Sequence, residues 1–267
     1  MNIGIIGIGC IGSSLARDIK AKSLGQVYLC DNNPDYLQKS QELGLGDQYF
    51  DKAEDLAKDC DIIFVCVPVT AIPLVIKSIA PYLKSGAIVT DVGSVKSFIL
   101  EQVSGCMPDN AHYIPGHPIT SGTVETGPEA GREGVFEGAR YILTPPSDTS
   151  SEPIKTISNL LEGLGADILL LDPDKHDQLL GFTSHLSHVI AFSAMNSASK
   201  LSEKLGEDVT RYAGGSFKDL TRVAASDVTM WRDIFLCNKK HVRELYKGTS
   251  RNSVKYRCLE QRCCRIM

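Results

Sequence analysis

The stretch from Gly7 to Gly12 reads Gly-Ile-Gly-Cys-Ile-Gly and follows directly on Asn2–Ile6, a short apolar run without charge. Such a run is typical of a strand buried on both faces of a parallel sheet. In the pattern Gly-x-Gly-x-x-Gly, the first glycine makes a tight turn and the second lets a pyrophosphate approach the backbone. The third lets the next helix, expected from about Ile11 to Lys22, pack on the strand and direct its N-terminal N–H groups at the phosphate. The stretch therefore predicts a dinucleotide-binding βαβ unit.

Asp31 ends the next apolar run, nineteen residues after Gly12. A carboxylate at this point accepts hydrogen bonds from a ribose diol and repels a 2′-phosphate. The following residues, Asn32 and Asn33, supply no cation for such a phosphate, so NAD is expected as the cofactor and NADP is disfavoured. The candidate cofactor-binding residues are Gly7, Gly9, Cys10, Ile11, Gly12, Asp31, Val67 and Ser94.

The composition is that of a soluble globular protein, with 43% hydrophobic and 22% charged residues among 267. A net charge of -4 gives no electrostatic reason to expect nucleic acid or an anionic membrane as a partner. No apolar run approaches the roughly 20 residues of a membrane span, and Met1 leads straight into the first strand. A cytoplasmic protein is expected, with its scattered cysteines as free, buried thiols.

Strand-like and helix-like segments alternate as far as Asp172, which predicts a doubly wound α/β domain with a parallel sheet over residues 1–172. From Pro173 only helical periodicity remains, so residues 173–267 are expected to form an all-helical substrate and dimerisation domain. The segment from Asp174 to about Glu203 is too apolar for a surface helix. We expect it to be buried, and a second copy of the chain, in a homodimer, is the simplest partner.

Two loops are expected at carboxyl ends of strands, where open α/β sheets bind ligands. Ser94 lies in Asp91–Lys96, and His117 lies in Pro115–Thr120 between Gly116 and Pro118. Ser94 could be a helix N-cap, a catalytic residue, or both. His117 could be a plain surface histidine, but its stiff flanks favour a functional role.

The helical segment carries three histidines, of which His185 and His188 are three residues apart and share a helix face. No acid stands at a matching spacing, so a metal site is not expected and a place in a ligand cleft is favoured. Further along, Arg222 has apolar neighbours. This favours a guanidinium that points into a site, where its fork would suit a carboxylate.

Five motifs in this order resemble the prephenate/arogenate (cyclohexadienyl) dehydrogenase family of tyrosine biosynthesis. They are Gly7–Gly12, Asp91–Lys96, Gly116–Ile119, Ser184–His188 and Phe217–Arg222. The resemblance implies NAD-dependent oxidative decarboxylation of prephenate to 4-hydroxyphenylpyruvate, or of arogenate to tyrosine. It does not decide between the two substrates.

The same resemblance implies catalytic roles for two residues. It implies that His117 is the base or hydrogen-bond acceptor at the ring hydroxyl, and that Ser94 bonds the same hydroxyl and helps to orient His117. Arg222 binds a substrate carboxylate. His185 and His188 line the pocket, with Trp231 packed nearby.

Two stretches depart from the family pattern. Residues 120–125 carry one extra residue and a displaced acid, Glu125, which puts that acid's polar contact in doubt. From about Gly248 the chain is dense in Arg and Cys where the family has long helices. We hypothesise that this tail is a shifted or truncated reading; its Cys258, Cys263 and Cys264 have no recognised metal spacing.

Two rival interpretations remain open. A β-hydroxyacid dehydrogenase has a similar layout but uses a lysine on the first long helix of its second domain. Here the corresponding region offers His185 and His188, and no lysine before Lys200. A protein that binds nicotinamide without turnover is the second alternative.

Overall fold

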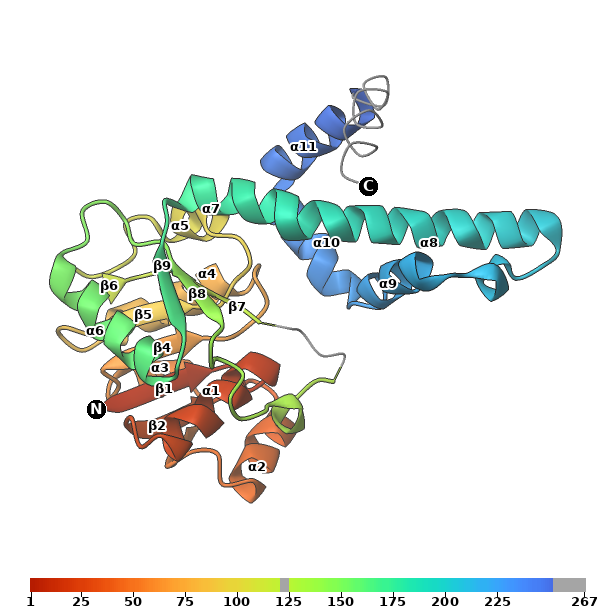
Figure 1. Ribbon diagram of the computed structural model, residues 1–267. Helices are drawn as coiled ribbons and strands as arrows, with labels where there is room; N and C mark the ends of the chain where they lie inside the picture. The colour runs from red at the N-terminus through yellow and green to blue at the C-terminus, as the bar shows by residue number, and fades with distance from the viewer. Residues whose placement is uncertain (121–124, 252–267) are drawn as a thin grey trace. The chain divides into compact units, whose positions relative to one another are not determined.

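The computed structural model describes residues 1–120 and 125–251 and divides the chain into two compact units, Met1–His176 and Asp177–Met267 (Figure 1). The division falls inside helix α7 (Pro173–Leu180), close to the boundary expected at Asp172. Two expectations concern segments outside the described residues. One is the extra residue within 121–124, and the other is the tail with Cys258, Cys263 and Cys264.

The first unit contains a six-stranded, all-parallel sheet in the order β3-β2-β1-β4-β5-β6. This is the strand order of a Rossmann fold, so the doubly wound α/β domain is confirmed. Its ligand-binding crevice is expected outside the carboxyl ends of β1 and β4, where the strand order reverses. The strands are β1 (Asn2–Ile6), β2 (Gln26–Cys30), β3 (Gln48–Phe50), β4 (Ile62–Val65), β5 (Ile88–Asp91) and β6 (His112–Tyr113).

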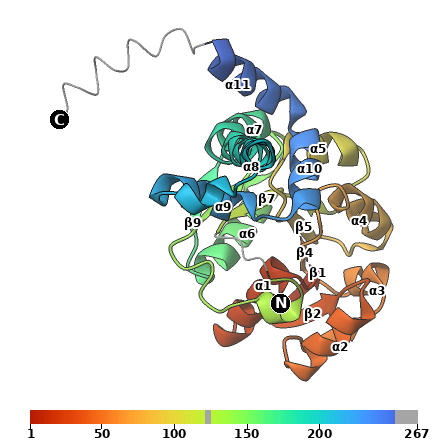
Figure 2. The same cartoon turned by 90° about the vertical axis from the view of Figure 1, so that its right-hand side faces the viewer.

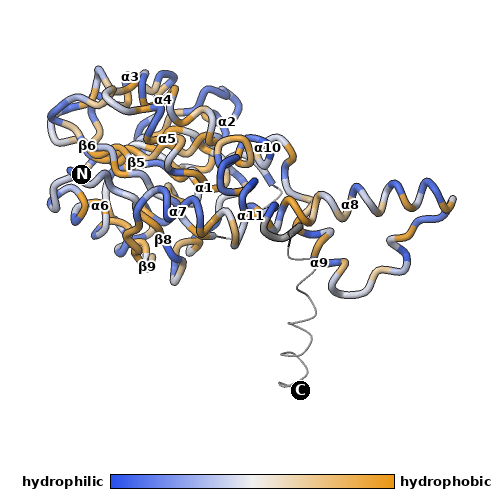
Figure 3. The backbone as a smooth tube through the Cα atoms, turned by 90° about the horizontal axis from the view of Figure 1, so that it is seen from above, coloured by the Kyte–Doolittle hydropathy of each residue, from blue (hydrophilic) through white to orange (hydrophobic). Residues whose placement is uncertain are grey.

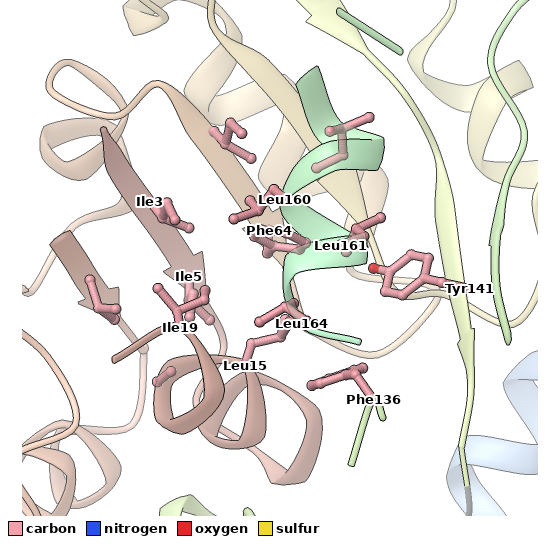
Figure 4. Packing of buried hydrophobic residues seen from close by; sticks show 14 of the residues in the cluster. Ile3, Ile5, Leu15, Ile19, Phe64, Phe136, Tyr141, Leu160, Leu161 and Leu164 are labelled. Carbon is pink, nitrogen blue, oxygen red and sulfur yellow. The ribbon is translucent and has the colours of Figure 1, made fainter. Parts of the chain in front are cut away.

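Helices cover both faces of this sheet: α1 and α6 lie on one side and α3, α4 and α5 on the other (Figure 2). The bounds are α1 (Cys10–Ala21), α2 (Pro34–Glu42), α3 (Ala53–Ala57), α4 (Ile72–Ile79), α5 (Ser97–Val103) and α6 (Ser151–Gly163). Figure 4 shows part of the core between α1, α6 and the sheet, which includes Leu15, Phe64 and Leu161. These three side chains are fully buried, and each contributes about 1.5–3 kcal/mol relative to an exposed side chain.

A second, three-stranded sheet was not foreseen. It has the order β7 (Gly116–Ile119), β8 (Arg140–Leu143) and β9 (Asp167–Leu170). The segment expected as a loop at Pro115–Thr120 is largely strand β7, because antiparallel pairing with β8 satisfies its backbone. Pro118 is tolerated there because β7 is an edge strand of this sheet. His117 therefore stands on a strand rather than on a loop.

The second unit is helical, as expected. It comprises the end of α7, a π-helical turn (Gly181–His185), α8 (Leu186–Leu205), a 3-10 turn (Val209–Tyr212), α9 (Gly215–Ala224), α10 (Val228–Cys237) and α11 (Lys239–Arg251). The π turn interrupts the single helix expected from Asp174 to Glu203. Helix α8 carries alternating hydrophobic and hydrophilic bands (Figure 3). Within one chain Phe182, Ile190 and Leu201 are 59%, 48% and 46% exposed, so the predicted burial of this stretch is not met inside a single chain.

No helix in residues 1–120 and 125–251 is long and apolar enough to cross a membrane.

Candidate functional site

The glycine turn after β1 has the close contacts that its pattern predicts. Gly7 adopts φ +95°, and a Cβ added to it would lie 2.6 Å from the Cys66 carbonyl oxygen and 2.9 Å from Val67 Cγ1. A Cβ on Gly12 would lie 2.0 Å from the Gly7 carbonyl oxygen, so only glycine lets α1 pack this closely on the turn. A Cβ on Gly9 would meet no heavy atom within 4 Å. The open space at Gly9, beside the N-terminus of α1, fits a pyrophosphate.

The carboxylate of Asp31 is held against this turn. Its Oδ2 accepts a hydrogen bond from the Ile8 N–H at 2.6 Å, and its Oδ1 accepts one from the Asn33 N–H at 2.9 Å. The acid at the end of β2 is thus fixed next to the glycine turn, and its side chain is only partly buried. Asp31 can orient the turn and still offer oxygen lone pairs to a ribose.

Helix α1 also carries a row of buried polar side chains that anchor a later segment of the chain, residues 128–134. Ser14 Oγ accepts the Arg132 N–H at 3.0 Å, and Asp18 Oδ1 accepts the Gly134 N–H at 2.8 Å. A Cβ on Gly131 would lie 2.2 Å from Ser13 Oγ. The glycine-rich, mixed-charge composition of residues 122–138 predicts a mobile loop or a short helix. In the structure, residues 128–134 of this stretch are hydrogen-bonded to α1 and include a 3-10 turn, Pro128–Ala130.

One cofactor candidate, Cys10, also contacts this part of the chain, with its Sγ 3.6 Å from the Ala130 carbonyl oxygen. A second candidate, Ile11, packs against the main hydrophobic core. Burial raises the pKa of the Cys10 thiol, which keeps it protonated and unreactive. Glu125, the displaced acid, is exposed and lies 3.6 Å from the Arg132 guanidinium.

His117 lies on β7 and contacts a second histidine. Its Nδ1 is 2.9 Å from Nε2 of His176, and the two rings meet edge to face with centroids 5.1 Å apart. His176 is fully buried at the start of α7, whereas His117 is partly exposed. One nitrogen of such a contact must accept, so the two rings cannot both be cations. When His117 Nδ1 donates, its Nε2 presents a lone pair and can act as a base.

The role of His176 was not foreseen from the sequence. His176 is 59 residues from His117 in the sequence, and its only signal there was that it lies in a helical stretch with two other histidines. A helical or strand periodicity relates only residues that are near in sequence. It could not reveal this contact, which depends on β7 and α7 lying together in the folded chain.

Ser94 lies in the connection between β5 and α5 and is partly exposed. Helix α5 begins at Ser97, and Lys96 occupies its N-cap position without a side-chain cap. Of the alternatives that the sequence left open for Ser94, the N-cap of this helix is therefore wrong. The flanking residues Asp91 and Lys96 are fully buried, with Lys96 Nζ 2.5 Å from Asp91 Oδ1.

In the second unit, Trp231 brings the two other candidate histidines together. The His188 ring stacks on Trp231 with centroids 3.4 Å apart and an interplanar angle of 17°, and His185 meets it edge-on at 6.0 Å. His188 Nδ1 donates to the Ser184 carbonyl at 3.0 Å. Burial lowers the pKa of His188, so this ring is neutral at pH 7, with Nε2 as its acceptor.

His185 is fully buried, and its Nδ1 lies 3.0 Å from the Asn238 side-chain nitrogen. That amide also donates to the Asp177 carbonyl at 2.8 Å. Because an amide nitrogen has two protons and no acceptor, His185 Nδ1 accepts and its proton resides on Nε2. The Asn238 side chain, which directly follows α10, thus connects α7 to the π turn, and His185 lies edge-on to Trp231.

Arg222 is exposed in the last turn of α9, between the partly buried Leu220 and Val223. Among the described residues it makes no ion pair. A cation at this end of a helix is stabilised by the helix dipole and remains available to an anionic ligand. The described residues contain no group of three or more histidine, cysteine, aspartate or glutamate side chains that could hold a metal ion.

Comparisons with known proteins cover both units. A family model described as the nucleotide-binding domain of prephenate dehydrogenase matches residues 15–170, and one described as its dimerization domain matches residues 172–259. The cyclohexadienyl dehydrogenase of Zymomonas mobilis is 38% identical over 89% of this chain and 80% of that protein.

Two solved structures are similar over nearly the whole chain. Prephenate dehydrogenase of Aquifex aeolicus, in complex with hydroxyphenyl propionate and NAD+, has a TM-score of 0.89 and 32% identity, and the match covers 99% of this chain and 92% of that one. Arogenate dehydrogenase of Synechocystis has a TM-score of 0.81 and 28% identity, with coverage of 98% and 92%. The glycine turn, the strand order and the helical second unit thus occur in a chain that belongs to the prephenate dehydrogenase family.

Proposed function

We propose that this chain catalyses the NAD-dependent oxidative decarboxylation of prephenate or arogenate. Bound NAD would accept a hydride from the substrate ring carbon that carries the hydroxyl. The observation that carries the proposal is the His117–His176 contact, in the same unit as the dinucleotide turn. It supports a partly exposed imidazole with one nitrogen fixed by a buried partner and the other available as a base.

The proposed chemistry at the ring hydroxyl uses two side chains. His117 Nε2 accepts the hydroxyl proton while Nδ1–H donates to His176 Nε2, and Ser94 bonds the same hydroxyl. A positioned base of this kind contributes about 10²–10⁴ in rate. Loss of the ring carboxylate as carbon dioxide makes the ring aromatic, so the reaction is strongly downhill.

The helical unit is proposed to hold the substrate's carboxylate and side chain. Arg222 is exposed and has a fork that matches a carboxylate. His188 is partly exposed, neutral and braced by Trp231, so its Nε2 can accept a hydrogen bond. His185 would act by holding Trp231 and thereby His188, because its own side chain has no exposed surface.

We further propose that the chain works as a homodimer. The match to a family dimerization domain over residues 172–259 supports this. So does the set of large hydrophobic side chains that one chain leaves exposed. In the second unit this set includes Phe182, Ile190, Leu201, Leu205, Val228, Met230 and Leu236.

The decisive experiment is turnover by the purified chain. With NAD and prephenate or arogenate, absorbance at 340 nm is expected to rise as carbon dioxide is released. NAD binding without NADH formation from either substrate would favour the inert alternative. Formation of NADH from a β-hydroxyacid, but from neither cyclohexadiene, would favour the other rival.

Replacing Arg222 by glutamine is expected to raise KM for the substrate about 10- to 100-fold, because a charge-assisted bond of about 1.5–3 kcal/mol is lost. Arg222→Lys should retain part of the binding. Steady-state kinetics measure both, and Arg211→Gln, which removes an exposed cation from the same unit, is the matched control. A KM within twofold of the parent value in Arg222→Gln would refute the role.

Asp31→Asn is expected to lower the affinity for NAD about tenfold and to reduce the ratio of NAD affinity to NADP affinity. The amide keeps one acceptor oxygen but loses the charge that repels a 2′-phosphate. Calorimetric titration with both cofactors measures the change. Asp35→Asn removes an equal charge from the exposed first turn of α2 and should leave both affinities unchanged. An unaltered ratio of NAD to NADP affinity in Asp31→Asn would count against the assignment.

A further inference from the structure

A buried ion pair joins the two sheets of the first unit. Lys96 Nζ lies 2.5 Å from Asp91 Oδ1 and 2.5 Å from the Gly116 carbonyl oxygen. Asp91 also accepts the Gly93 N–H on Oδ1 and the Tyr113 hydroxyl on Oδ2, both at 2.7 Å. Lys96 and Asp91 are fully buried. One ammonium group thus fixes the end of β5, and with it β6, to the first residue of β7.

Both proposed catalytic residues are next to points that this network holds. Ser94 follows Gly93, whose N–H bonds Asp91, and lies two residues before Lys96. His117 follows Gly116, whose carbonyl bonds Lys96. We propose that Lys96 is a positioning residue that sets the separation of Ser94 and His117. This inference rests on the proposed function, since it takes those two side chains as the pair that contacts the ring hydroxyl.

The chemistry of the Lys96–Asp91 ion pair favours a role in positioning the two catalytic residues over a role in stabilising the fold. Burying two charges removes their hydration, and apolar replacements of buried ion pairs are often equally stable or more stable. An ammonium group offers three donors in a compact space, so it can bond a carboxylate and a carbonyl at once. The backbone is also tightly packed at this point. A Cβ on Gly116 would lie 2.7 Å from Tyr141 Cε1 and 2.9 Å from the Asp91 carbonyl oxygen.

The test removes the charges together. Lys96→Met alone would leave Asp91 buried without its cation and endanger folding. The double variant Asp91→Asn/Lys96→Gln removes both charges, and Tyr113→Phe removes one bond to Asp91 without a charge change. Tyr141→Phe is the control, because it removes a buried hydroxyl beside Gly116 that makes no hydrogen bond to the network. All proteins are assayed as full chains, with kcat normalised to NAD-binding sites.

The double variant is expected to lower normalised kcat at least tenfold, with Tyr113→Phe intermediate, while KM for NAD and the control's kcat stay within twofold. A purely structural role would reduce the number of competent sites but leave kcat per site unchanged, and that result would overturn the proposal.

A second readout does not need turnover. In ¹⁵N-histidine spectra, the fixed tautomer of His117 is expected to become averaged in the double variant and to persist in Tyr141→Phe. If the parent chain turns over neither substrate, the proposed function fails and these spectra still decide the positioning. An unchanged His117 tautomer in the double variant refutes it.

Discussion

His117→Asn is expected to lower kcat about 10²- to 10⁴-fold, which is the usual contribution of a positioned general base. Affinity for NAD should remain, because the glycine turn and Asp31 are separate from β7. Stopped-flow measurement of NADH formation gives the rate of the chemical step, and calorimetry gives NAD binding.

Two further variants locate the effect. His112→Asn removes a partly exposed histidine from β6 and should leave kcat unchanged. His176→Phe removes the partner of His117 Nδ1 but leaves His117 in place, so an intermediate loss of kcat is expected. If His117→Asn kept more than a tenth of the parent kcat, another residue would have to be the base.

Gly12→Ala is expected to abolish measurable NAD binding. The new methyl would lie 2.0 Å from the Gly7 carbonyl oxygen, and a backbone atom cannot move aside as a flexible side chain can. Helix α1 would have to shift away from the turn, at about 1–3 kcal/mol for an overpacked site. Calorimetry with NAD and thermal unfolding of the same samples test both effects.

Gly9→Ala separates binding from packing. Its methyl would meet no protein atom within 4 Å, so the unfolding temperature should stay within a few degrees of the parent value while NAD affinity falls at least tenfold. Gly214→Ala, also in open space but in the helical unit, should change neither property. Tight NAD binding by Gly9→Ala would show that the pyrophosphate does not use this space.

The sequence predicts those parts of the fold that depend on local pattern. Asn2–Ile6, the three glycines and Asp31 follow one another over 30 residues. Each has a mechanical role that can be inferred from its position. The change from strand to helical character after Asp172 is likewise local, and the helical second unit confirms it.

What the sequence did not predict depends on contacts between distant segments. The segment around His117 looked like a loop because Gly116 and Pro118 are poor strand formers, and its partner β8 lies more than 20 residues away. Buried polar residues on α1, such as Ser14 and Asp18, gave no signal of their own because their partners lie more than 100 residues later. For the same reason the His176 contact was missed.

The attachment of residues 128–134 to α1 has a consequence for protein engineering. The cofactor turn looks like a portable module of about thirty residues, yet its helix leaves Ser13, Ser14 and Asp18 to be covered by a segment far along the chain. A chimera that transplanted only residues 1–31 into a foreign scaffold would remove the Arg132 and Gly134 N–H donors from Ser14 and Asp18, and any scaffold segment packed on α1 would bury these acceptors without them. A successful graft therefore requires that residues 128–134 be transferred together with the glycine turn and α1.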